Sequence, residues 1–492
     1  MNTNRSKRLS SGAGGLDEIL EGGLIPQNTC LIRGGPGTGK TTIGLQFLCE
    51  GVKNKEKSLF LSLSETVEKI SNDARQKGFE IEKIDFLDLT PSLEERVDEI
   101  DHSIFPTSEV EQPSLINEIT GKIQQVKPDR IFFDGITQLY YLAADTYQFR
   151  KQILSLIKFS TNEGSTVMLS SEASSTIHDD DLQFMCDGVI NLEYTGEKRG
   201  VRITKFRGSG FKQGVHSLEL SSRGMVVYPK INPGNINKKF TRGKITSGVP
   251  ELDELLKGGV EKGTATVISG PTGVGKTTLA VQFAKEASGR GERSVIYTFE
   301  EGEDSLIQRC KNVNIPIDKM IEHETLSVVK LNPLDYAPDQ FAHQIREEIE
   351  EKNTQIIILD SISGYLLSFI SEDSNNHNSM LRHIHSLSEY LKNMGVTLLL
   401  TNEVHNITGD FKVSEYGISY LADNIIFLRY LEVKGEMRKA IGVLKKRMSD
   451  FEKNLRELNI TSYGIKVGSP LRELRGILSG NPNFINVDNS QE

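Results

Sequence analysis

Two glycine-rich stretches of the chain have the composition and spacing of a loop that binds nucleotide phosphates. Residues 34–41 read GGPGTGKT and residues 270–277 read GPTGVGKT, and both fit the pattern G-x-x-x-x-G-K-[ST]. The glycines let the backbone wrap the phosphates, and N–H groups at the start of the following helix point at them. The lysine reaches the β- and γ-phosphates, and the hydroxyl after it holds Mg²⁺. We therefore predict two nucleotide sites.

Each site is predicted from a strand, a loop and a helix, with an aspartate on a later strand. The predicted nucleotide-binding residues are Gly34, Gly37, Thr38, Gly39, Lys40, Thr41 and Thr42 in the first stretch, and Gly270, Gly273, Val274, Gly275, Lys276, Thr277 and Thr278 in the second. The apolar runs 130–133 and 356–359 end in Asp134 and Asp360. Many buried strands end in aspartate, but after a P-loop such a carboxylate is expected to reach the Mg²⁺ shell. The predicted metal ligands are Thr41, Asp134, Thr277 and Asp360.

The two stretches belong to an internal repeat. Lys276 follows Lys40 by 236 positions, and the same offset relates Ser11-Gly12, Leu16-Asp17-Glu18 and Gly22-Gly23 to Ser247-Gly248, Leu252-Asp253-Glu254 and Gly258-Gly259. The alternative, glycine-rich turns that bind no nucleotide, does not explain two matches inside a duplicated frame. The repeat predicts an N-terminal domain over 1–232, a polar linker over 233–243, a C-terminal domain over 244–465 and a tail over 466–492.

Composition indicates an ordinary globular protein. Of the 492 residues, 37% are hydrophobic and 25% charged, and the net charge of −9 disfavours a protein that coats nucleic acid. The four cysteines have no metal spacing and are expected to be reduced and mostly buried. We find no signal peptide and no apolar run of membrane-spanning length, so we expect a cytoplasmic protein without membrane contact.

Alternating strand and helix patterns predict an α/β fold with a mostly parallel sheet flanked by helices in each copy. In the first copy the late runs 188–194, 201–206, 215–220 and 224–228 are expected to be antiparallel strands at the sheet edge. The acidic stretch 81–113 is expected to be irregular.

Fast hydrolysis needs a group that activates water. It also needs positive charge placed against the γ-phosphate. Glu300 and Glu301 follow the predicted strand 294–299 and are candidate bases, whereas the aligned pair in the first copy is Ser64 and Glu65. The alternative is a solvated pair of carboxylates at a helix start.

Positive charge recurs near the end of a late strand in both copies. The residues are Lys205 and Arg207 in the first copy and Lys445 and Arg447 in the second, and alternation places both members of each pair on one face. They could form a solvated basic edge. The functional interpretation is that they reach the nucleotide of a neighbouring subunit, so that hydrolysis depends on ring assembly.

The double P-loop, the lead-in S-G-x-x-x-L-D-x-x-L-x-G-G, the tandem glutamates and the Lys-x-Arg strands resemble the RecA-type ATPases of the KaiC family, over roughly residues 8–485. The resemblance implies tandem RecA-like domains and a two-tiered homohexamer with ATP and Mg²⁺ at the subunit interfaces. It also implies that the N-terminal tier is mainly an ATPase and that the C-terminal tier phosphorylates and dephosphorylates itself.

Departures from the family pattern qualify that expectation. The family's neighbouring phosphorylated serine and threonine align with Ser419 and Tyr420, and a tyrosyl oxygen lies further from its backbone than a threonyl oxygen. The glycine usual after the Lys-x-Arg strand is present as Gly208 but replaced by Met448. Ser64 replaces the first glutamate of the tandem pair, so slower hydrolysis is expected in the first tier.

Other functions remain open at this stage. One is a nucleic-acid motor or recombinase of the same superfamily, and another is a nucleotide-switched ring scaffold. KaiB-like and KaiA-like partners could dock on 81–113 and on the segment after 466, or these segments could be solvated loops. A circadian role and a stress-signalling role fit the same residues.

Overall fold

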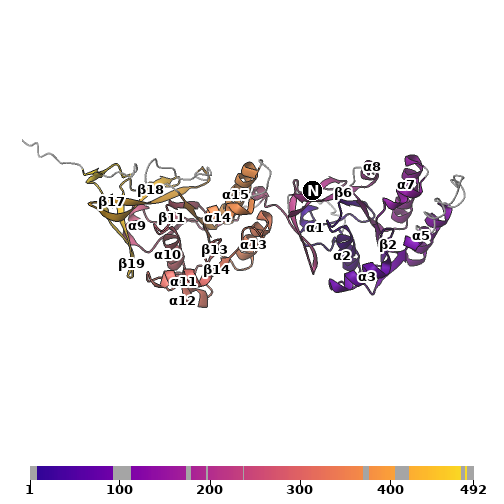
Figure 1. Cartoon of the computed structure of the whole chain (residues 1–492), viewed down its shortest axis with the longest axis horizontal. Helices are drawn as coiled ribbons and strands as arrows, with labels where there is room; N and C mark the ends of the chain where they lie inside the picture. Colours follow the sequence, from indigo (N-terminus) through magenta and orange to yellow (C-terminus); the bar gives the residue numbers. More distant parts are fainter. Residues whose placement is uncertain are drawn as a thin grey trace, which may run out of the picture. The chain divides into compact units, whose positions relative to one another are not determined.

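The computed structural model of the chain describes residues 8–91, 112–143, 145–172, 179–195, 198–235, 238–369, 376–404, 420–477 and 483–484. The chain divides into two compact units, a first domain Met1–Lys230 and a second domain Ile231–Glu492. Figure 1 shows the two domains with their labelled elements.

The described part of the first domain contains one nine-stranded sheet in the order β3-β2-β4-β5-β1-β6-β7-β8-β9. Its strands are β1 Thr29–Gly34, β2 Ser58–Ser62, β3 Ile84–Asp88, β4 Arg130–Asp134, β5 Thr166–Glu172, β6 Gly188–Thr195, β7 Lys198–Phe206, β8 His216–Ser221 and β9 Gly224–Tyr228. From β3 to β6 neighbouring strands are parallel, and from β6 to β9 they are antiparallel.

Helices cover both faces of this sheet, which explains why its central strands are almost wholly buried. The helices are α1 Leu16–Ile19, α2 Lys40–Lys53, α3 Val67–Gln76, α5 Gln112–Val126, α6 Gln138–Leu142, α7 Thr146–Asn162 and α8 Asp180–Met185. Successive residues of β1 point to opposite faces, so Ile32 packs in the core under α1–α3 and Leu31 in the core under α5–α8.

The second domain repeats this architecture, with the sheet order β14-β13-β15-β16-β12-β17-β18-β19-β20. Its strands are β12 Ala265–Gly270, β13 Ser294–Thr298, β14 Leu326–Lys330, β15 Ile356–Asp360, β16 Thr397–Glu403, β17 Asn424–Val433, β18 Glu436–Lys446, β19 Arg456–Thr461 and β20 Gly464–Pro470. Its helices are α9 Pro250–Leu255, α10 Lys276–Gly289, α11 Glu303–Lys311, α12 Ile317–Glu322, α13 Pro338–Glu350, α14 Ile362–Leu366 and α15 Asn376–Asn393. Short pairs β10 Lys244–Ile245 with β11 Val260–Glu261, and β21 Leu474–Arg475 with β22 Asn483–Phe484, lie outside the large sheet.

The fold-class prediction is confirmed, since both sheets are mostly parallel and flanked by helices. All four cysteines are free and buried, as expected. In the described ranges no helix is long and apolar enough to cross a membrane.

Three details of the prediction are wrong. The stretch 81–113 is not irregular throughout, because Ile84–Asp88 forms the edge strand β3; residues 92–111 lie outside the described part. The run from 188 is not antiparallel to its inner neighbour, since β6 lies parallel to β1 and only then does the chain reverse. The end of the second domain at 465 is too early, because β20 pairs with β19 as far as Pro470.

The predicted linker begins with a 3-10 turn, Pro233–Asn235, that packs on the second domain. The Asn393 side chain donates to the Pro233 carbonyl at 3.0 Å, and the Lys238 amide donates to the Asn393 carbonyl at 3.0 Å. This part of the linker is therefore anchored to α15.

The cores of the two domains differ in the sizes of two contacting residues, one on the helix after the P-loop and one on the strand that ends in aspartate. A methyl group on Gly44 of α2 would lie 2.2 Å from the Phe132 ring of β4. At the matching positions of the second domain, Ala280 and Ile358 are both fully buried. The larger side chain on the strand is thus matched by the smaller residue on the helix.

We expect Gly44→Ala to destabilise the first domain by about 1–3 kcal/mol, because the ring has no room to move in a packed core. Gly44→Ala/Phe132→Ile should recover most of this loss. Denaturant unfolding measures the difference. The control is Gly121→Ala in α5, where nothing lies within 4 Å of the added methyl, and this change should not destabilise. Equal stability of Gly44→Ala and the wild type would contradict the packing argument.

Candidate nucleotide-binding sites

Both P-loops connect the central strand of a sheet to the helix behind it. The first lies between β1 and α2 and the second between β12 and α10. Gly37 and Gly39 have φ of 70° and 102°, and Gly273 and Gly275 have φ of 74° and 116°. Glycine adopts this left-handed conformation without steric cost, which explains the spacing of the motif. The loops lie at the carboxyl edge of the parallel strands, where ligands bind in sheets of this kind.

The P-loop lysines lie in their own loops. Lys40 Nζ donates to the carbonyl oxygens of Gly34 at 2.8 Å and Gly35 at 2.9 Å, and Lys276 Nζ donates to Pro271 O at 2.9 Å. Burial lowers the pKa of both lysines, while nearby carboxylates oppose this effect. An ammonium held among carbonyl groups is placed to exchange these contacts for phosphate oxygens.

Each P-loop threonine contacts the predicted metal-binding aspartate. Thr41 Oγ1 donates to Asp134 Oδ2 at 2.8 Å, and Thr277 Oγ1 lies 2.9 Å from both oxygens of Asp360. Hydroxyl and carboxylate oxygens are the hard ligands that suit Mg²⁺, so the residues fit this ion. They would hold it beside the phosphates, where its charge would offset theirs.

A hydroxyl on the neighbouring strand orients each of these aspartates, and neither hydroxyl was predicted from the sequence. Ser170 Oγ on β5 donates to Asp134 at 2.7 Å, and Thr401 Oγ1 on β16 donates to Asp360 at 2.5 Å. Burial raises the pKa of both aspartates, and these hydrogen bonds oppose that rise. The signal available in the sequence was a hydroxyl residue near the carboxyl end of the strand beside each P-loop strand.

A further carboxylate lies beside each P-loop and was also missed. Glu172 ends β5 opposite Gly34, and Glu403 ends β16 opposite Gly270. The Glu403 carboxylate accepts a short hydrogen bond from Thr272 Oγ1 of the loop. These glutamates oppose the lowering of the pKa of Lys40 and Lys276.

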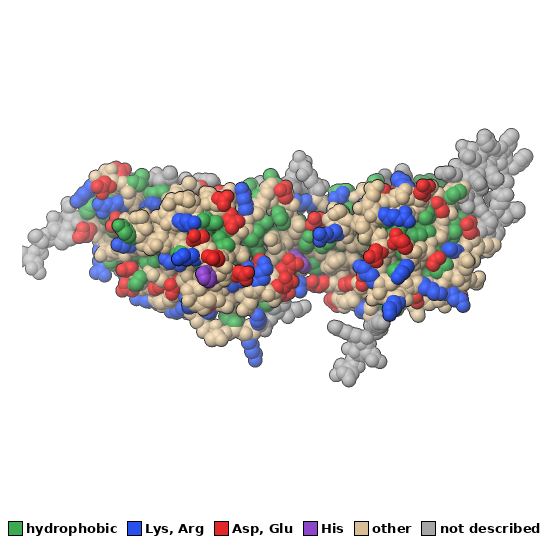
Figure 2. Space-filling model, turned by 90° about the horizontal axis from the view of Figure 1, so that it is seen from below, with side chains coloured by type: hydrophobic (Ala, Val, Ile, Leu, Met, Phe, Trp, Pro, Cys, Tyr) green, Lys and Arg blue, Asp and Glu red, His purple; other side chains and the backbone are tan. Residues whose placement is uncertain are grey.

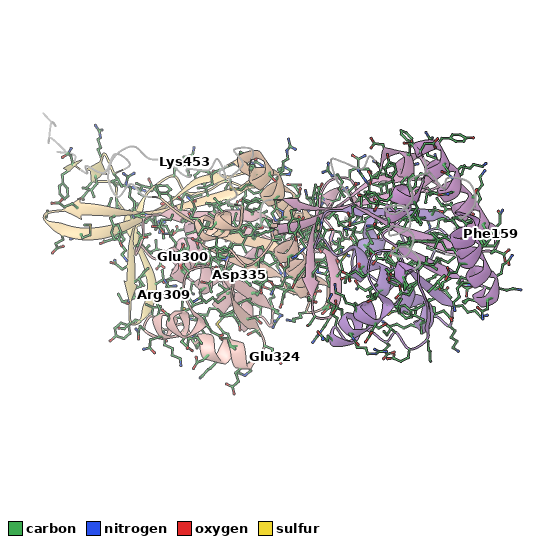
Figure 3. The ribbon with its side chains drawn as sticks, turned by 45° about the vertical axis from the view of Figure 1, so that its right-hand side comes forward. Phe159, Glu300, Arg309, Glu324, Asp335 and Lys453 are labelled. Carbon is green, nitrogen blue, oxygen red and sulfur yellow. The ribbon has the colours of Figure 1, made fainter. Side chains whose placement is uncertain are left out.

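The two candidate bases of the second domain have different surroundings. Glu301 forms an ion pair with Arg309 at 2.6 Å and accepts from Ser305 at 2.7 Å, and Figure 3 labels Arg309 and Glu300 in this region. Glu300 Oε1 accepts a hydrogen bond from the neutral hydroxyl of Ser361 at 2.9 Å. Glu301 is thus held by a cation and a hydroxyl, whereas Glu300 is bound by one neutral hydroxyl and is the candidate base with fewer contacts to exchange.

The first domain lacks both members of the Glu300–Ser361 pair. Ser64 stands at the position of Glu300, and Gly135 at that of Ser361, with the Ser64 Cβ 2.8 Å from where a Gly135 side chain would begin. The remaining candidate, Glu65, is half exposed and pairs with Lys69 at 3.1 Å. Among the described residues of the first domain, neither Ser64 nor Glu65 is therefore an oriented carboxylate equivalent to Glu300.

The Lys-x-Arg residues lie away from the P-loop of their own domain. Phe206 pairs with Gly188, and Gly188 pairs with Cys30 near the start of β1, whereas the P-loop follows the end of β1. Lys205 Nζ donates to the carbonyls of Gln183 at 2.8 Å and Phe184 at 3.2 Å, and Arg207 lies 3.5 Å from Asp187.

The second domain has the same arrangement, because Lys446 pairs with Asn424 and Asn424 with Thr266. Arg447 lies 3.6 Å from Asp423 and donates to the Tyr420 carbonyl at 3.0 Å. Burial and the adjacent Arg447 lower the pKa of Lys445. Both arginines follow the last residue of their strand, in the turn beyond it.

Of the two predicted phosphorylation sites, Ser419 lies outside the described residues. Tyr420 is 50% exposed and lines a shallow cavity with Leu381, Arg382, His385 and Ser386 of α15. The Tyr420 side chain is therefore not buried.

We expect Asp360→Asn to stabilise the second domain when ATP and Mg²⁺ are left out, because it removes a buried charge. A raised pKa means that the folded state holds this proton more tightly than the unfolded state, so ionisation of Asp360 opposes folding. The midpoint of thermal unfolding should rise by about 2–4 °C for each kcal/mol gained. The gain should fade as the pH falls through the raised pKa, and Mg²⁺ with ATP should no longer stabilise the variant. A lower midpoint at neutral pH without ligands would contradict this account.

Known proteins that are similar to this chain belong to a family of ATPases, as two P-loop sites lead one to expect. The family model described as "ATPase: KaiC" matches residues 9–232 and 245–472. The chain is similar to the circadian clock protein KaiC3 of Synechocystis sp., with 27% identity over 98% of this chain and 96% of the relative. It is also similar to the circadian clock oscillator proteins KaiC of Synechococcus elongatus (27% identity) and Rippkaea orientalis (28%), over 97% of this chain and 92% of each relative. With both P-loop domains inside the matched ranges, the chain belongs to the KaiC family of ATPases.

Proposed function

We propose that this ATPase works as a homohexameric ring in which each nucleotide site is completed by the neighbouring copy. We further propose that the second domain phosphorylates and dephosphorylates itself on Ser419. One observation carries the ring proposal, namely that the Lys-x-Arg residues lie at the opposite edge of the sheet from the P-loop of their own domain.

The distance involved decides against a contact within one domain. β1 has six residues, and at about 3.3 Å per residue its two ends lie roughly 20 Å apart. The P-loop follows one end, and the Lys-x-Arg residues lie level with the other. An arginine side chain cannot span that length from the turn after Phe206 to its own P-loop. A head-to-tail arrangement of copies would place each arginine against the next P-loop, and such an interface closes into a ring when the rotation allows it.

The chemistry follows from the charges in the second site. Phosphoryl transfer depends on positioning and on positive charge against the equatorial phosphate oxygens, which Lys276 and the neighbour's Lys445 and Arg447 would supply. Mg²⁺ held by Thr277 and Asp360 would add to that charge. Glu300 would take the proton from the attacking hydroxyl, whether of water or of Ser419, while the γ-phosphoryl group leaves ADP for that oxygen.

For the first domain we propose slow hydrolysis. Ser64 and Gly135 replace the oriented carboxylate, while the P-loop and the Thr41–Asp134 pair that would bind nucleotide are retained. These features favour a tier that mainly holds the ring together through bound ATP. In this respect the first domain resembles a nucleotide-switched scaffold.

Other roles rest on the family alone. Two of the relatives carry the name circadian clock oscillator protein, and a timing or stress-signalling role with KaiB-like and KaiA-like partners is proposed on that ground. The nucleic-acid motor is disfavoured. On the faces seen in Figure 2, lysine and arginine are interspersed with acidic side chains, and the net charge is −9.

Mixing two inactive variants tests the ring. Lys276→Ala should remove turnover at its own second site but leave Arg447 intact, and Arg447→Ala should do the reverse. In rings mixed equally, about a quarter of the interfaces pair an intact P-loop with an intact arginine, so turnover should partly return. Turnover of the mixture that equals the mean of the two variants would contradict sites shared between copies. Native mass spectrometry checks that rings have mixed.

Phosphopeptide mass spectrometry tests the autokinase. After incubation with Mg²⁺ and ATP, phosphate is expected at Ser419 and should be absent from Glu300→Gln/Glu301→Gln. Glu300→Gln alone should cause most of the loss, because Glu301 is engaged by Arg309. Phosphate also at Tyr420 would show that the site accepts the longer side chain. ATP consumption without phosphate anywhere between Val413 and Asp423 would remove the autokinase and leave a ring ATPase.

A further inference from the structure

The residue that orients Glu300 begins a helix of a single turn. Ser361 is the N-cap of α14, and its Oγ donates to Glu300 Oε1 at 2.9 Å while it accepts from the Gly364 amide at 3.2 Å. The Tyr365 amide donates to the Ser361 carbonyl at 3.1 Å and closes the turn. A helix of one turn is not stable by itself, so its position depends on packing. Tyr365, its largest side chain, is almost fully buried.

The hydroxyl of Tyr365 is bound inside the second domain. It lies 2.7 Å from Nε2 of His383 on α15, and Nδ1 of the same ring lies 3.8 Å from Asp339 Oδ1 on α13. A carboxylate that faces Nδ1 favours the tautomer with its proton there, so Nε2 accepts and the tyrosine donates. Burial and the charge of Asp339 raise the pKa of Tyr365 well above its usual range, which keeps its hydroxyl a neutral donor.

The ring of Tyr365 also contacts the residue before Glu300. The ring centroids of Tyr365 and Phe299 lie 5.5 Å apart, and the ring of Phe341 on α13 packs against both, at 4.8 and 5.8 Å. A methyl group on Gly364 would lie 2.7 Å from the Phe299 Cβ, so α14 and the segment after β13 are in close contact. Tyr365 is thus connected to Glu300 by two routes, one through the turn of α14 and one through Phe299.

The first domain has different residues at these positions. Leu139 stands where the second domain has Tyr365, with the offset of 226 that relates β4 to β15. Gln152 stands where the second domain has His383, with the offset of 231 that relates β5 to β16. Leu139 is buried, so an apolar side chain is enough to pack the short helix of that domain. The tyrosine and the histidine therefore occur in the domain that has the oriented glutamate.

We propose that Tyr365 and His383 are positioning residues for Glu300. The inference rests on the proposed function, in which Glu300 takes the proton of the attacking hydroxyl. The Glu300 carboxylate is exposed, and an exposed side chain without a partner samples several rotamers. Anchored through Tyr365 to His383, α14 keeps the Ser361 hydroxyl on one carboxylate oxygen and leaves the other to accept the proton. Both residues act only through Glu300.

Removal of single groups tests this, with the ATP turnover that Lys276→Ala abolishes as the readout. Tyr365→Phe removes the hydroxyl, and His383→Phe removes both nitrogens but keeps a ring against Phe369. Each should lower kcat about tenfold, which is part of the roughly 10²–10⁴-fold that a general base contributes, and leave KM for ATP within about twofold. His383→Gln, which can place an amide oxygen near the position of Nε2, should recover most of the turnover.

The decisive measurement combines these changes with Glu300→Gln. If Tyr365 and His383 act through Glu300, then Tyr365→Phe and His383→Phe should cause no further loss in that background. A role in folding alone would lower turnover in both backgrounds. The matched control is Tyr390→Phe on α15, because Tyr390 is fully buried in the same core and its hydroxyl donates to Glu350 at 3.3 Å. Its turnover should stay at the wild-type value.

The same measurements separate this inference from the proposal beneath it. A wild-type kcat in either Tyr365→Phe or His383→Phe, with a large loss in Glu300→Gln, would overturn the inference and leave the proposed base standing. Further losses in the Glu300→Gln background would also overturn it. Wild-type turnover in Glu300→Gln alone would overturn both, because there would be no base to position. Where His383→Phe yields no ring, Tyr365→Phe, which removes one oxygen atom, decides the outcome.

Discussion

The contact between the P-loop threonine and the strand-end aspartate constrains the rest of each domain. β5 lies between β1 and β4, so Thr41 at the start of α2 and Asp134 at the end of β4 come from strands that are not neighbours. Thr41 Oγ1 and Asp134 Oδ2 lie 2.8 Å apart only because β5 is placed between β4 and β1 and α2 starts at the carboxyl ends of these strands. The same insertion brings the Ser170 hydroxyl from β5 onto Asp134. Asp134 and Asp360 are thus equivalent buried residues at the carboxyl ends of the strands in the two sheets. Burial makes the ionised form of each costly without a cation.

Both domains keep this contact, but they differ in two pairs of contacting residues. Gly44 with Phe132 stands where the second domain has Ala280 with Ile358, and the sum of the two side chains is kept rather than either one. Ser64 with Gly135 stands where the second domain has Glu300 with Ser361. The first exchange maintains packing, whereas the second changes chemistry, since a carboxylate and the hydroxyl that orients it are both lost. The two domains therefore share one frame and differ in the carboxylate that lies at the end of the strand beside the site.

Sequence reasoning predicted the frame well because its signals are local. Glycine spacing, strand-end aspartates and alternating helix and strand patterns depend on residues near one another, and they placed the P-loops and the parallel sheets. It failed where pairing across the sheet decides. β3 is a short edge strand in an acidic stretch. The residues of β6 do not indicate whether this strand runs parallel or antiparallel to β1. The orienting hydroxyls and the Tyr365–His383 contact were missed for the same reason, because their roles depend on which strand or helix lies next to them. The site residues assigned from motifs stay predictions about a complex with nucleotide.

Chain reversal after β6 separates two functions along one strand. Had β7 run parallel to β1, the Lys-x-Arg residues would lie at the carboxyl edge beside their own P-loop and could serve it directly. Because β7 runs antiparallel, its first residues reach the P-loop of their own domain and its last residues lie at the far edge. β18 repeats this arrangement. In the proposed ring, the Lys-x-Arg residues of one copy would add positive charge to a P-loop of the next. Strand direction therefore decides which residues of one strand lie beside the P-loop of their own domain and which lie at the opposite end of the sheet.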